Sequence, residues 1–432
     1  MTVKEKSMAE IIVTVWFVLI GTLMYYFLTQ VIQVGLFITY RHAFALVLVF
    51  SAVVCFLIKP DAARGIVCLK GAFIYSVPLI VTLAVSLFIW FEGQVDTAVV
   101  FRGLSSSLVY MNMLSFALAA GAFLYIFGEK GIWYNLLSIL IANILMIITI
   151  IAQNGIGPFF SELVTLVITF AGETGDIIVQ AEIHELAFCI GAYLVYMLLK
   201  PKKKPYFIIL FILSVFCFVA AFKRIGIISV AAALLLGLVL KLFAKAKEDI
   251  AGRWAYGISI ALVVILIFYV AIIKMGAFEY LEKSGVDTNG RVDIYNAVDK
   301  YYKFSPEFLG NGIGFLTYQL NTGMNVGVAS VHNDFLQHFI DLGFWGYIIW
   351  LISMTVVRIK SFGGGRMADG EIITLALTLY LFISSSTDNT MNYPLLTGVL
   401  AMLMMGNGFD GRVNEAEMKI FGCISDTGRI IK

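Results

Sequence analysis

Residues 254–275 read WAYGISIALVVILIFYVAIIKM, an apolar run in which Lys274 is the only charged side chain. A hydrocarbon core about 30 Å thick needs roughly 20 such residues per helix, so this run is long enough to cross a membrane. The whole chain of 432 residues has the same character, because 60% of it is hydrophobic and 13% is charged, with a mean hydropathy of +0.93. Soluble domains carry about 25% charged residues. The composition therefore predicts an all-α, polytopic membrane protein.

Scanning outward from this run by the same rule gives about twelve spans. The first begins near the N-terminus and lacks a small-residue cleavage site, so we expect it to remain as a helix. The predicted spans are residues 9–29, 42–58, 70–91, 107–128, 132–152, 182–199, 205–222, 225–243, 254–275, 337–357, 371–386 and 391–408.

The basic residues predict the orientation of these spans, because cytoplasmic loops are enriched in Lys and Arg. Placing both termini in the cytoplasm puts most of the 30 Lys and Arg residues on that side, and the loop 153–181, which has none, outside. We expect one domain over residues 1–410 in the cytoplasmic membrane, with a large extracytoplasmic loop at about 275–336 and a short cytoplasmic tail at 411–432. A formal net charge of only +2 gives no indication of a nucleic-acid partner.

The predicted outer loop contains an arginine suited to binding a diphosphate. Arg291 follows the turn-forming residues 287–290 and precedes residues 292–299, which we predict to form a helix on the membrane face. Its guanidinium is planar, permanently charged and able to form paired hydrogen bonds with phosphate oxygens. The alternative is a solvated loop arginine that pairs with Asp287 or Asp293.

The same loop contains Gly310-Asn311-Gly312-Ile313-Gly314 and His332-Asn333-Asp334. No predicted strand precedes the glycines, so we interpret them as a sharp turn or a close backbone approach and not as a nucleotide-binding loop. His332 directly precedes a predicted helix that Asn333 or Asp334 can cap. An imidazole there can act as a general base near neutral pH. The alternative is that His332 belongs only to the cap.

Further polar residues fall on the same predicted face. Lys223-Arg224 interrupts two apolar stretches, His184 opens a span, and Asp388 lies between the last two spans. The basic pair is either part of a functional site or a turn whose side chains reach lipid headgroups. His184 and Asp388 are, in the alternative reading, simple helix-end polar groups. Their convergence with Arg291 and His332 predicts a site for an anionic substrate that enters from the lipid.

Two observations argue against a metal cofactor. His332 and His338 are six residues apart, which places them on different faces of a helix. The segment 29–42 contains no Asp or Glu that would hold a cation near the first predicted outer loop. We therefore expect metal-free chemistry in which arginines neutralise a phosphate leaving group.

These motifs resemble the O-antigen ligase and polymerase (Wzy-type) superfamily of bacterial polysaccharide assembly. The junction Lys223-Arg224-Ile225-Gly226 is similar to one family motif, although Lys223 stands where the family usually has a small polar residue. Gly290-Arg291 with the glycines after it is similar to the start of the family's large loop. The clearest part of the resemblance is His332-Asn333-Asp334-Phe335-Leu336 followed by Leu342-Gly343-Phe344-Trp345-Gly346.

The resemblance implies a membrane glycosyltransferase that uses a polyprenyl-diphosphate-linked oligosaccharide as donor, without a metal or nucleotide cofactor. It implies that Arg224 and Arg291 hold the diphosphate with help from Lys223. It also implies that His332 takes a proton from the acceptor hydroxyl or orients it, with inversion at the anomeric carbon. We predict Asn333, together with His184 and Asp388 above, as further substrate-binding residues. The expected partners are the bilayer and, during synthesis, chain-length regulator and flippase proteins.

Three functions fit these expectations. The favoured one is a polymerase that joins lipid-linked repeat units into an O-antigen, a capsule or an exopolysaccharide. A ligase that moves finished glycan to a lipid or protein acceptor would use the same chemistry. A lipid-linked oligosaccharide flippase or other transporter would carry its charges near the middle of its spans, whereas the unusual polar residues here collect at one predicted face.

Overall fold

The computed structural model describes most of the chain, and every regular element in the described residues is a helix. The chain divides into two compact units. Unit 1 comprises Met1–Phe73, Leu114–Val230 and Pro394–Lys432, and unit 2 comprises Ile74–Met113 and Ala231–Tyr393. The described residues are 3–27, 39–93, 97–169, 177, 184–221, 223–246, 248–285, 288, 290–322, 331–363 and 368–422.

Three long helices contribute residues to both units, and eight others belong to unit 1 among the residues described. The shared helices are α3 (Ala62–Glu92), α4 (Thr97–Phe127) and α10 (Arg224–Ala246). The helices of unit 1 are α1 (Val3–Tyr26), α2 (Tyr40–Ile58), α5 (Lys130–Asn154), α6 (Ile156–Thr169), α8 (His184–Leu199), α9 (Pro205–Ala221), α18 (Pro394–Gly406) and α19 (Phe409–Gly422).

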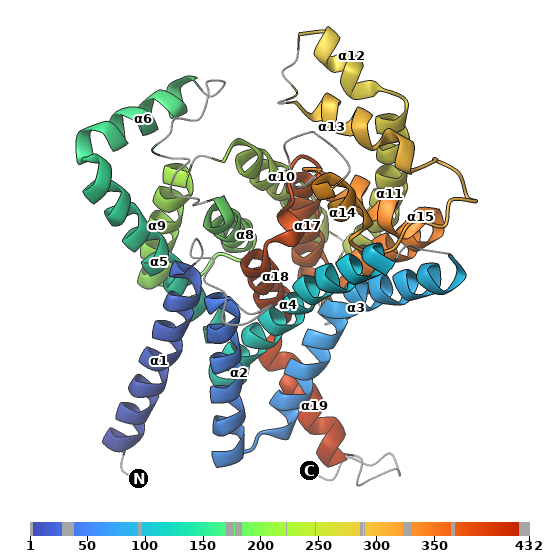
Figure 1. The fold of residues 1–432 in the computed structure, drawn as a ribbon. Coiled ribbons are helices and arrows are strands. Elements are labelled where there is room, and N and C mark those ends of the chain that lie inside the picture. Colours follow the sequence, from blue (N-terminus) through green and yellow to red (C-terminus); the bar gives the residue numbers. More distant parts are fainter. Residues whose placement is uncertain are drawn as a thin grey trace. The chain divides into compact units, whose positions relative to one another are not determined.

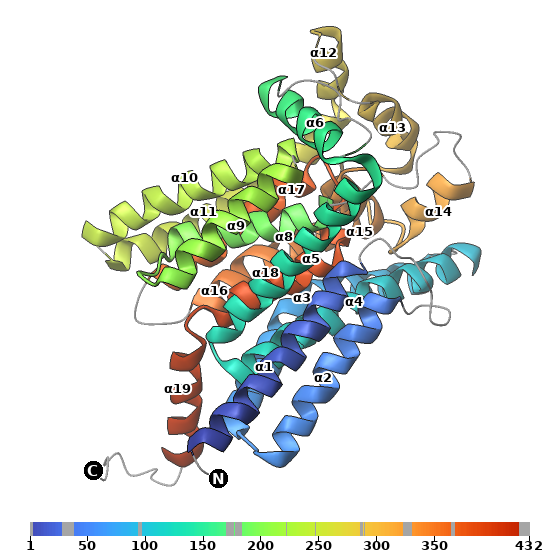
Figure 2. The ribbon, with the colours of Figure 1, turned by 90° about the vertical axis from the view of Figure 1, so that its left-hand side faces the viewer.

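Helix α8 forms the centre of unit 1. Every residue from 185 to 197 is buried, as expected for a helix that is apolar on all sides. It packs against α5, α9 and α18, whereas α1 and α2 lie side by side (Figures 1 and 2). Helix α6 turns away from the end of α5 at Gly155 (Figure 1), where the backbone φ is 91°.

Several of the buried polar groups inside unit 1 are paired with one another. The Tyr193 hydroxyl donates to Asn135 Oδ1 at 2.8 Å, and Asn135 Nδ2 donates to the Tyr25 hydroxyl at 3.1 Å. At the start of α8, Glu185 Oε1 accepts the main-chain N–H of Leu395 at 2.8 Å, and Glu185 Oε2 pairs with Arg41 at 3.1 Å. Glu185 therefore caps α18 and ties α2 to α8, because unpaired polar groups in an apolar core are costly.

Unit 2 holds the long polar loop and the helices around it. The loop, which the sequence places at about 275–336, is itself largely helical where it is described. The further elements of unit 2 are α11 (Glu248–Lys274), α12 (Ala277–Lys283), α13 (Arg291–Val298), η1 (Asp299–Tyr301), α14 (Phe315–Thr322), α15 (Asp334–Ile352), η2 (Ser353–Val357), α16 (Arg358–Gly363), α17 (Asp369–Ser385) and η3 (Thr390–Asn392).

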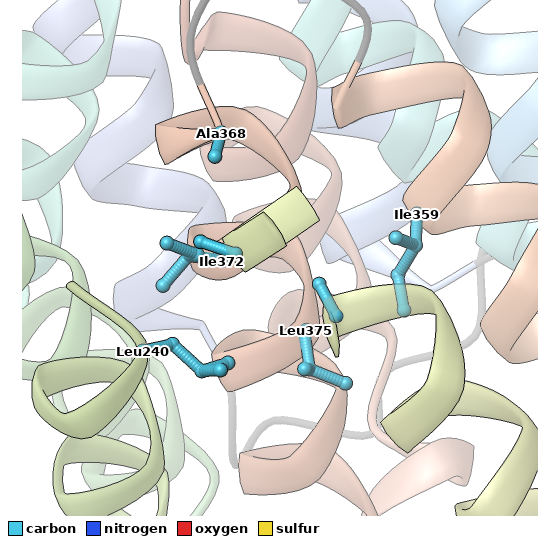
Figure 3. Close-up of a cluster of buried hydrophobic side chains, with 7 residues drawn as sticks. Leu240, Ile359, Ala368, Ile372 and Leu375 are labelled. Atoms are coloured by element: carbon cyan, nitrogen blue, oxygen red, sulfur yellow. The ribbon is translucent and has the colours of Figure 1, made fainter. Parts of the chain in front are cut away.

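A buried apolar cluster joins four helices of this unit (Figure 3). Small alanines on α11 leave room for branched side chains from the neighbouring helices, which lets the backbones approach closely. The cluster consists of Leu240 on α10, Ala251 and Ala255 on α11, Ile359 on α16, and Ala368, Ile372 and Leu375 at and along the start of α17.

Helix α15 is broken at Gly343, and the glycine-rich segment docks at the break. Gly343 has φ 70° and ψ −176°, so the helical hydrogen-bond ladder is interrupted there. The main-chain oxygen of Asp341 instead accepts the N–H groups of Asn311 and Gly312 at 3.1 and 2.8 Å, and Phe344 N–H donates to Phe308 O at 2.8 Å. The glycines therefore allow this part of the backbone to approach α15 closely.

The carboxylate of Asp341 stabilises the helix that follows the glycines. Its oxygens accept the N–H groups of Gly314 at 3.2 Å and Leu316 at 3.3 Å. These are among the donors that the first turn of α14 leaves without a helical partner. The glycine-rich segment is thus a structural joint between α14 and α15.

Seven of the described helices are long and apolar enough to cross a membrane. They include α1, α2, α3, α5, α10, α11 and the run from Asp334 to Gly363. Shorter apolar helices of 10–17 residues account for four more predicted spans. Each of the predicted spans overlaps a helix, so the multi-pass, all-α character is confirmed. The count of twelve, the orientation and the single domain over residues 1–410 stay predictions.

The helix predicted for residues 292–299 begins one residue earlier, at Arg291, and ends at Val298. Its start is set by Gly290, which has φ 71° and accepts the N–H of Ile294 at 3.4 Å. A positive φ is readily adopted only by glycine. The position of this helix on the membrane face stays a prediction.

The joint at Gly343 can be tested against a second glycine that also has a positive φ but no close neighbours. A Cβ added at Gly343 would overlap the main chain of Leu309 and Gly310, whereas one at Gly285, with φ 88°, would meet nothing within 4 Å. Replacing Gly285 by Ala should cost about 1–2 kcal/mol from the left-handed conformation alone. We expect Gly343→Ala to lower the unfolding temperature of the detergent-solubilised protein further than Gly285→Ala. Equal shifts would show that the close backbone contact is absent.

Candidate functional site

Three segments of unit 2 that are far apart in sequence meet at the start of α15. They are the first turn of α13, the turn that precedes α15, and the connection 386–393 after α17. Arg291 Nη2 donates to the main-chain oxygen of Thr387 at 2.7 Å, and Arg291 Nη1 donates to that of Thr288 at 3.2 Å. Arg291 therefore joins the long loop to the connection 386–393.

Asn333 is the hub of this meeting point. It is fully buried, and its Oδ1 caps α15 by accepting the N–H of Leu336 at 3.0 Å. Its Nδ2 donates to the hydroxyls of Tyr269 on α11 at 2.9 Å and Tyr295 on α13 at 3.1 Å. Tyr269 in turn donates to the main-chain oxygen of Ser386 at 2.8 Å. One side-chain amide thus connects α11, α13 and α15.

Asp334 holds the far end of the same connection. Its side chain is fully buried, and Oδ2 accepts the N–H of Met391 at 2.8 Å. Oδ1 lies 3.4 Å from Asn392 Nδ2. A buried carboxyl group whose oxygens accept hydrogen bonds avoids the cost of leaving a polar group unpaired in an apolar interior. Together with Arg291 and Tyr269, it fixes the path of residues 386–392.

This path places Asp388 beside His332. His332 Nδ1 lies 4.0 Å from Asp388 Oδ1, and the exposed fractions of the two side chains are 44% and 10%. Asp388 Oδ1 also accepts the Tyr393 hydroxyl at 3.2 Å and the N–H of Asn389 at 2.8 Å. The structure therefore presents an accessible imidazole next to a mostly covered carboxylate that is already oriented by other donors.

His332 adopts an uncommon backbone conformation for a residue with a side chain. Its φ is 50°, in the left-handed region that few residues other than glycine occupy. Val331 and Asn333 on either side are fully buried. The turn thus keeps its two neighbours inside while the imidazole reaches the surface.

The Nε–H donor of Arg291 is not used by the contacts described above. Its Nε is buried and has no hydrogen-bond partner among the residues that the structure describes. Burial raises the pKa of nearby Tyr295, while the hydrogen bond from Asn333 and the charge of Arg291 act to lower it. Tyr295 therefore stays protonated and can donate as well as accept. The arrangement offers an arginine N–H, a tyrosine hydroxyl and an imidazole within one connected network.

The structure brings together four of the predicted site residues, Arg291, His332, Asn333 and Asp388. The other three, His184, Lys223 and Arg224, belong to unit 1. Lys223 Nζ lies 5.9 Å from the ring centre of Phe188, and Arg224 is the first residue of α10, after the predicted short junction with α9. His184 begins α8, but its side chain lies outside the described residues. Their grouping with the cluster in unit 2 stays a prediction.

Sequence reasoning missed Tyr269, Tyr295 and Tyr393 and took Asp334 only as a possible cap. Tyrosines inside apolar or helical stretches carry no signal of their own, because most such residues simply pack. The capping residue is Asn333, which leaves Asp334 free to bind the connection 386–392. The sequence feature that pointed to this part of the site was the adjacent polar triplet His332-Asn333-Asp334.

Part of this chain is similar to a known protein family. Residues 208–351 match the family model described as O-antigen ligase. That confirms the resemblance to the O-antigen ligase and polymerase superfamily. The match runs from α9 through most of α15 and includes Arg224, Arg291 and His332. Comparison with curated proteins gives no match.

The family match indicates the class of protein to which the matched segment is similar. Members of the O-antigen ligase family are membrane enzymes of the glycosyltransferase type. The apolar helices and the family match together support a multi-pass membrane protein. Asp388 lies beyond the matched residues, and it is the tertiary structure that brings it next to His332.

Because Asn333 is the hub of the site, truncating it should lower the free energy of unfolding more than truncating Asn321. Asn333→Ala should lower the free energy of unfolding by about 1–3 kcal/mol, because α15 loses its cap and two buried hydroxyls lose a donor. Asn321→Ala is the control: Asn321 is exposed and its amide donates only to Thr317 O in its own helix at 2.8 Å, so the cost should stay within about 0.5 kcal/mol. Denaturant unfolding in detergent measures both. Similar losses would contradict the role of Asn333 as a hub.

Proposed function

We propose that this protein polymerises polyprenyl-diphosphate-linked oligosaccharide repeat units at the outer face of the cytoplasmic membrane. The observation that carries the proposal is the pairing of His332 with Asp388 at 4.0 Å beside the donor-rich Arg291. The expected topology of about twelve spans with cytoplasmic termini would place this cluster outside. Chain-length regulator and flippase proteins would be its partners in synthesis.

We infer that His332 acts as a general base supported by a carboxylate. Its Nδ1 faces Asp388, which leaves Nε2 to meet the acceptor. In the proposed step, Nε2 takes the proton of a sugar hydroxyl as the oxygen forms a bond to the anomeric carbon of the donor. Asp388 then stabilises the imidazolium, as a carboxylate behind a catalytic histidine does in other enzymes.

Arg291 would act on the leaving group. As the bond between the anomeric carbon and the diphosphate oxygen breaks, its electron pair passes to that oxygen. The guanidinium is already fixed by two main-chain oxygens, and preorganised charge of this kind stabilises a developing anion without reorganisation. Lys223 and Arg224 are proposed to bind the same diphosphate, and His184 and Asn333 to assist substrate binding. A single displacement inverts the anomeric carbon and needs no metal or nucleotide.

A ligase is the second candidate, and the family description favours it directly. A ligase would use the same donor and the same base but would transfer finished glycan to a lipid or protein acceptor. The difference lies in the acceptor and not in the residues described above.

The base can be tested with two variants that keep the diphosphate contacts. We expect His332→Ala to reduce the rate of glycan transfer at least about 100-fold, within the range that general bases contribute. Asp388→Asn should reduce it at least about tenfold, because the imidazolium loses its counter-charge. The measurement is transfer by purified protein from a synthetic polyprenyl-diphosphate oligosaccharide, with donor binding assayed separately. Unchanged turnover in His332→Ala would remove the proposed base.

The arginine can be tested by keeping its charge and changing its shape. Arg291→Lys retains a positive charge but loses the planar set of donors, so we expect weaker donor binding and slower transfer, by about tenfold or more. Lys303→Ala is the matched control, since Lys303 is an exposed base in the same loop. Wild-type donor binding and turnover in both Arg291→Lys and Arg291→Ala would rule out the diphosphate contact.

Product analysis distinguishes the two candidate reactions. If the protein polymerises, cells that lack it should accumulate glycan of a single repeat unit, and the purified protein should lengthen a lipid-linked repeat unit by itself. If it ligates, the same cells should accumulate long glycan that remains attached to the polyprenyl lipid. The second result would overturn the polymerase proposal while leaving the His332 mechanism open to the tests above.

A further inference from the structure

Unit 1 contains an apolar groove that the proposed reaction does not use. The groove encloses about 360 Å³, within the usual range for small-molecule sites. It is lined by α2 from Val49 to Phe56, by α3 from Ala62 to Leu69 and by α4 from Leu118 to Tyr125. Each helix contributes residues at positions i, i+3, i+4 and i+7, so one face of each helix forms the wall. Figure 1 shows α2 and the first turns of α3 diverging from their short connection.

Small residues keep this groove from closing. A Cβ added at Gly65 would meet only the Phe56 ring, at 3.8 Å, and one at Gly121 would meet Cys68 at 3.6 Å, both ordinary contacts. Ala52, Ala62 and Gly65 supply little volume across it. Within a bilayer this space adjoins hydrocarbon, and walls left without a partner would forfeit dispersion contacts. A hydrocarbon chain is therefore the natural occupant.

One end of the groove is polar and fixed. The Tyr125 hydroxyl donates to Lys59 O at 3.3 Å and accepts the N–H of Asp61 at 3.2 Å. Arg64 Nη1 donates to Tyr125 O at 3.3 Å, and its Nε pairs with Asp61 at 3.2 Å. This network holds the α2–α3 connection against the end of α4.

The same end carries an excess of positive charge. Lys59 is exposed and Arg64 is half-buried, while Asp61 is the only acidic residue from 59 to 64. Lysine stems can lie along apolar surface while their ammonium groups reach the level of lipid phosphates. An apolar groove that ends at basic side chains is complementary to a lipid with an anionic head and a hydrocarbon chain.

We propose that this groove binds an anionic phospholipid of the bilayer, with one acyl chain between α2 and α3 and its phosphate at Lys59 and Arg64. Juxtamembrane basic side chains attract anionic lipid headgroups in this way. By the predicted orientation the α2–α3 connection faces the cytoplasm, so this lipid belongs to the cytoplasmic leaflet. The proposal does not depend on the proposed function.

The site can be tested by filling the groove and, separately, by removing charge. The full-length protein is reconstituted in vesicles of phosphatidylethanolamine with phosphatidylglycerol and, in parallel, of phosphatidylethanolamine with phosphatidylcholine. Lipids that stay bound after extraction are identified by native mass spectrometry. Gly65→Leu fills the groove. Gly252→Leu, on α11, is its control, because a Cβ there meets nothing within 4 Å.

The wild type and Gly252→Leu should retain phosphatidylglycerol in preference to phosphatidylcholine. Gly65→Leu should retain about tenfold less, since displacing even two methylene groups of the chain has an effect of that size. Lys59→Gln should weaken phosphatidylglycerol retention about fivefold, whereas Lys70→Gln, which changes an exposed lysine at the other end of the α3 wall, should leave it unchanged. The proposal is overturned if the wild type holds both lipids equally, or if Gly65→Leu matches Gly252→Leu. Should Gly65→Leu fail to fold, undiminished retention in Lys59→Gln overturns it equally.

Discussion

The need to pair buried polar groups at the start of α15 governs the candidate site. Asn333 and Asp334 are both fully buried, and an unpaired amide or carboxylate there would cost several kcal/mol. Their partners come from α11, α13 and the connection after α17. Satisfying two side chains therefore brings four parts of the chain to one point. The neighbouring His332 is left as the accessible member of the triplet, beside Asp388.

A second constraint acts half-way along the same helix. The break at Gly343 frees main-chain groups that the glycine-rich segment and Phe308 then satisfy. Because no side chain fits between these backbones, the joint is specified by glycines on both sides. The long loop is thus attached to α15 at two places, through the glycines and through Tyr295 near its start, and Arg291 attaches it to the connection 386–393. A loop held in this way can carry an arginine in a fixed position.

The sequence identified several residues of the candidate site but predicted few of their contacts. Arg291, His332 and Asp388 could be singled out because charged or titratable residues are rare in this apolar chain. The alternative role for Arg291 was pairing with Asp287 or Asp293, whereas the bonds that fix its guanidinium go to the main-chain oxygens of Thr288 and Thr387. Main-chain acceptors cannot be identified from a sequence, since every residue has one. For the same reason the sequence did not predict the hydrogen bond from Tyr269 to the main-chain oxygen of Ser386.

The sequence by itself determined that the chain forms apolar helices long enough to cross a membrane, because hydropathy and length decide that segment by segment. It also identified the polar loop, the position of α13 and the helix start after His332. Only the tertiary structure decided that Asp388 stands beside His332, that Asn333 rather than Asp334 caps α15, and that the glycines form a joint. It also showed that Arg358 is buried over the Tyr75 ring, 4.0 Å from its centre. These outcomes depend on which distant groups are available to satisfy a buried donor or acceptor, and that is a property of the packed chain.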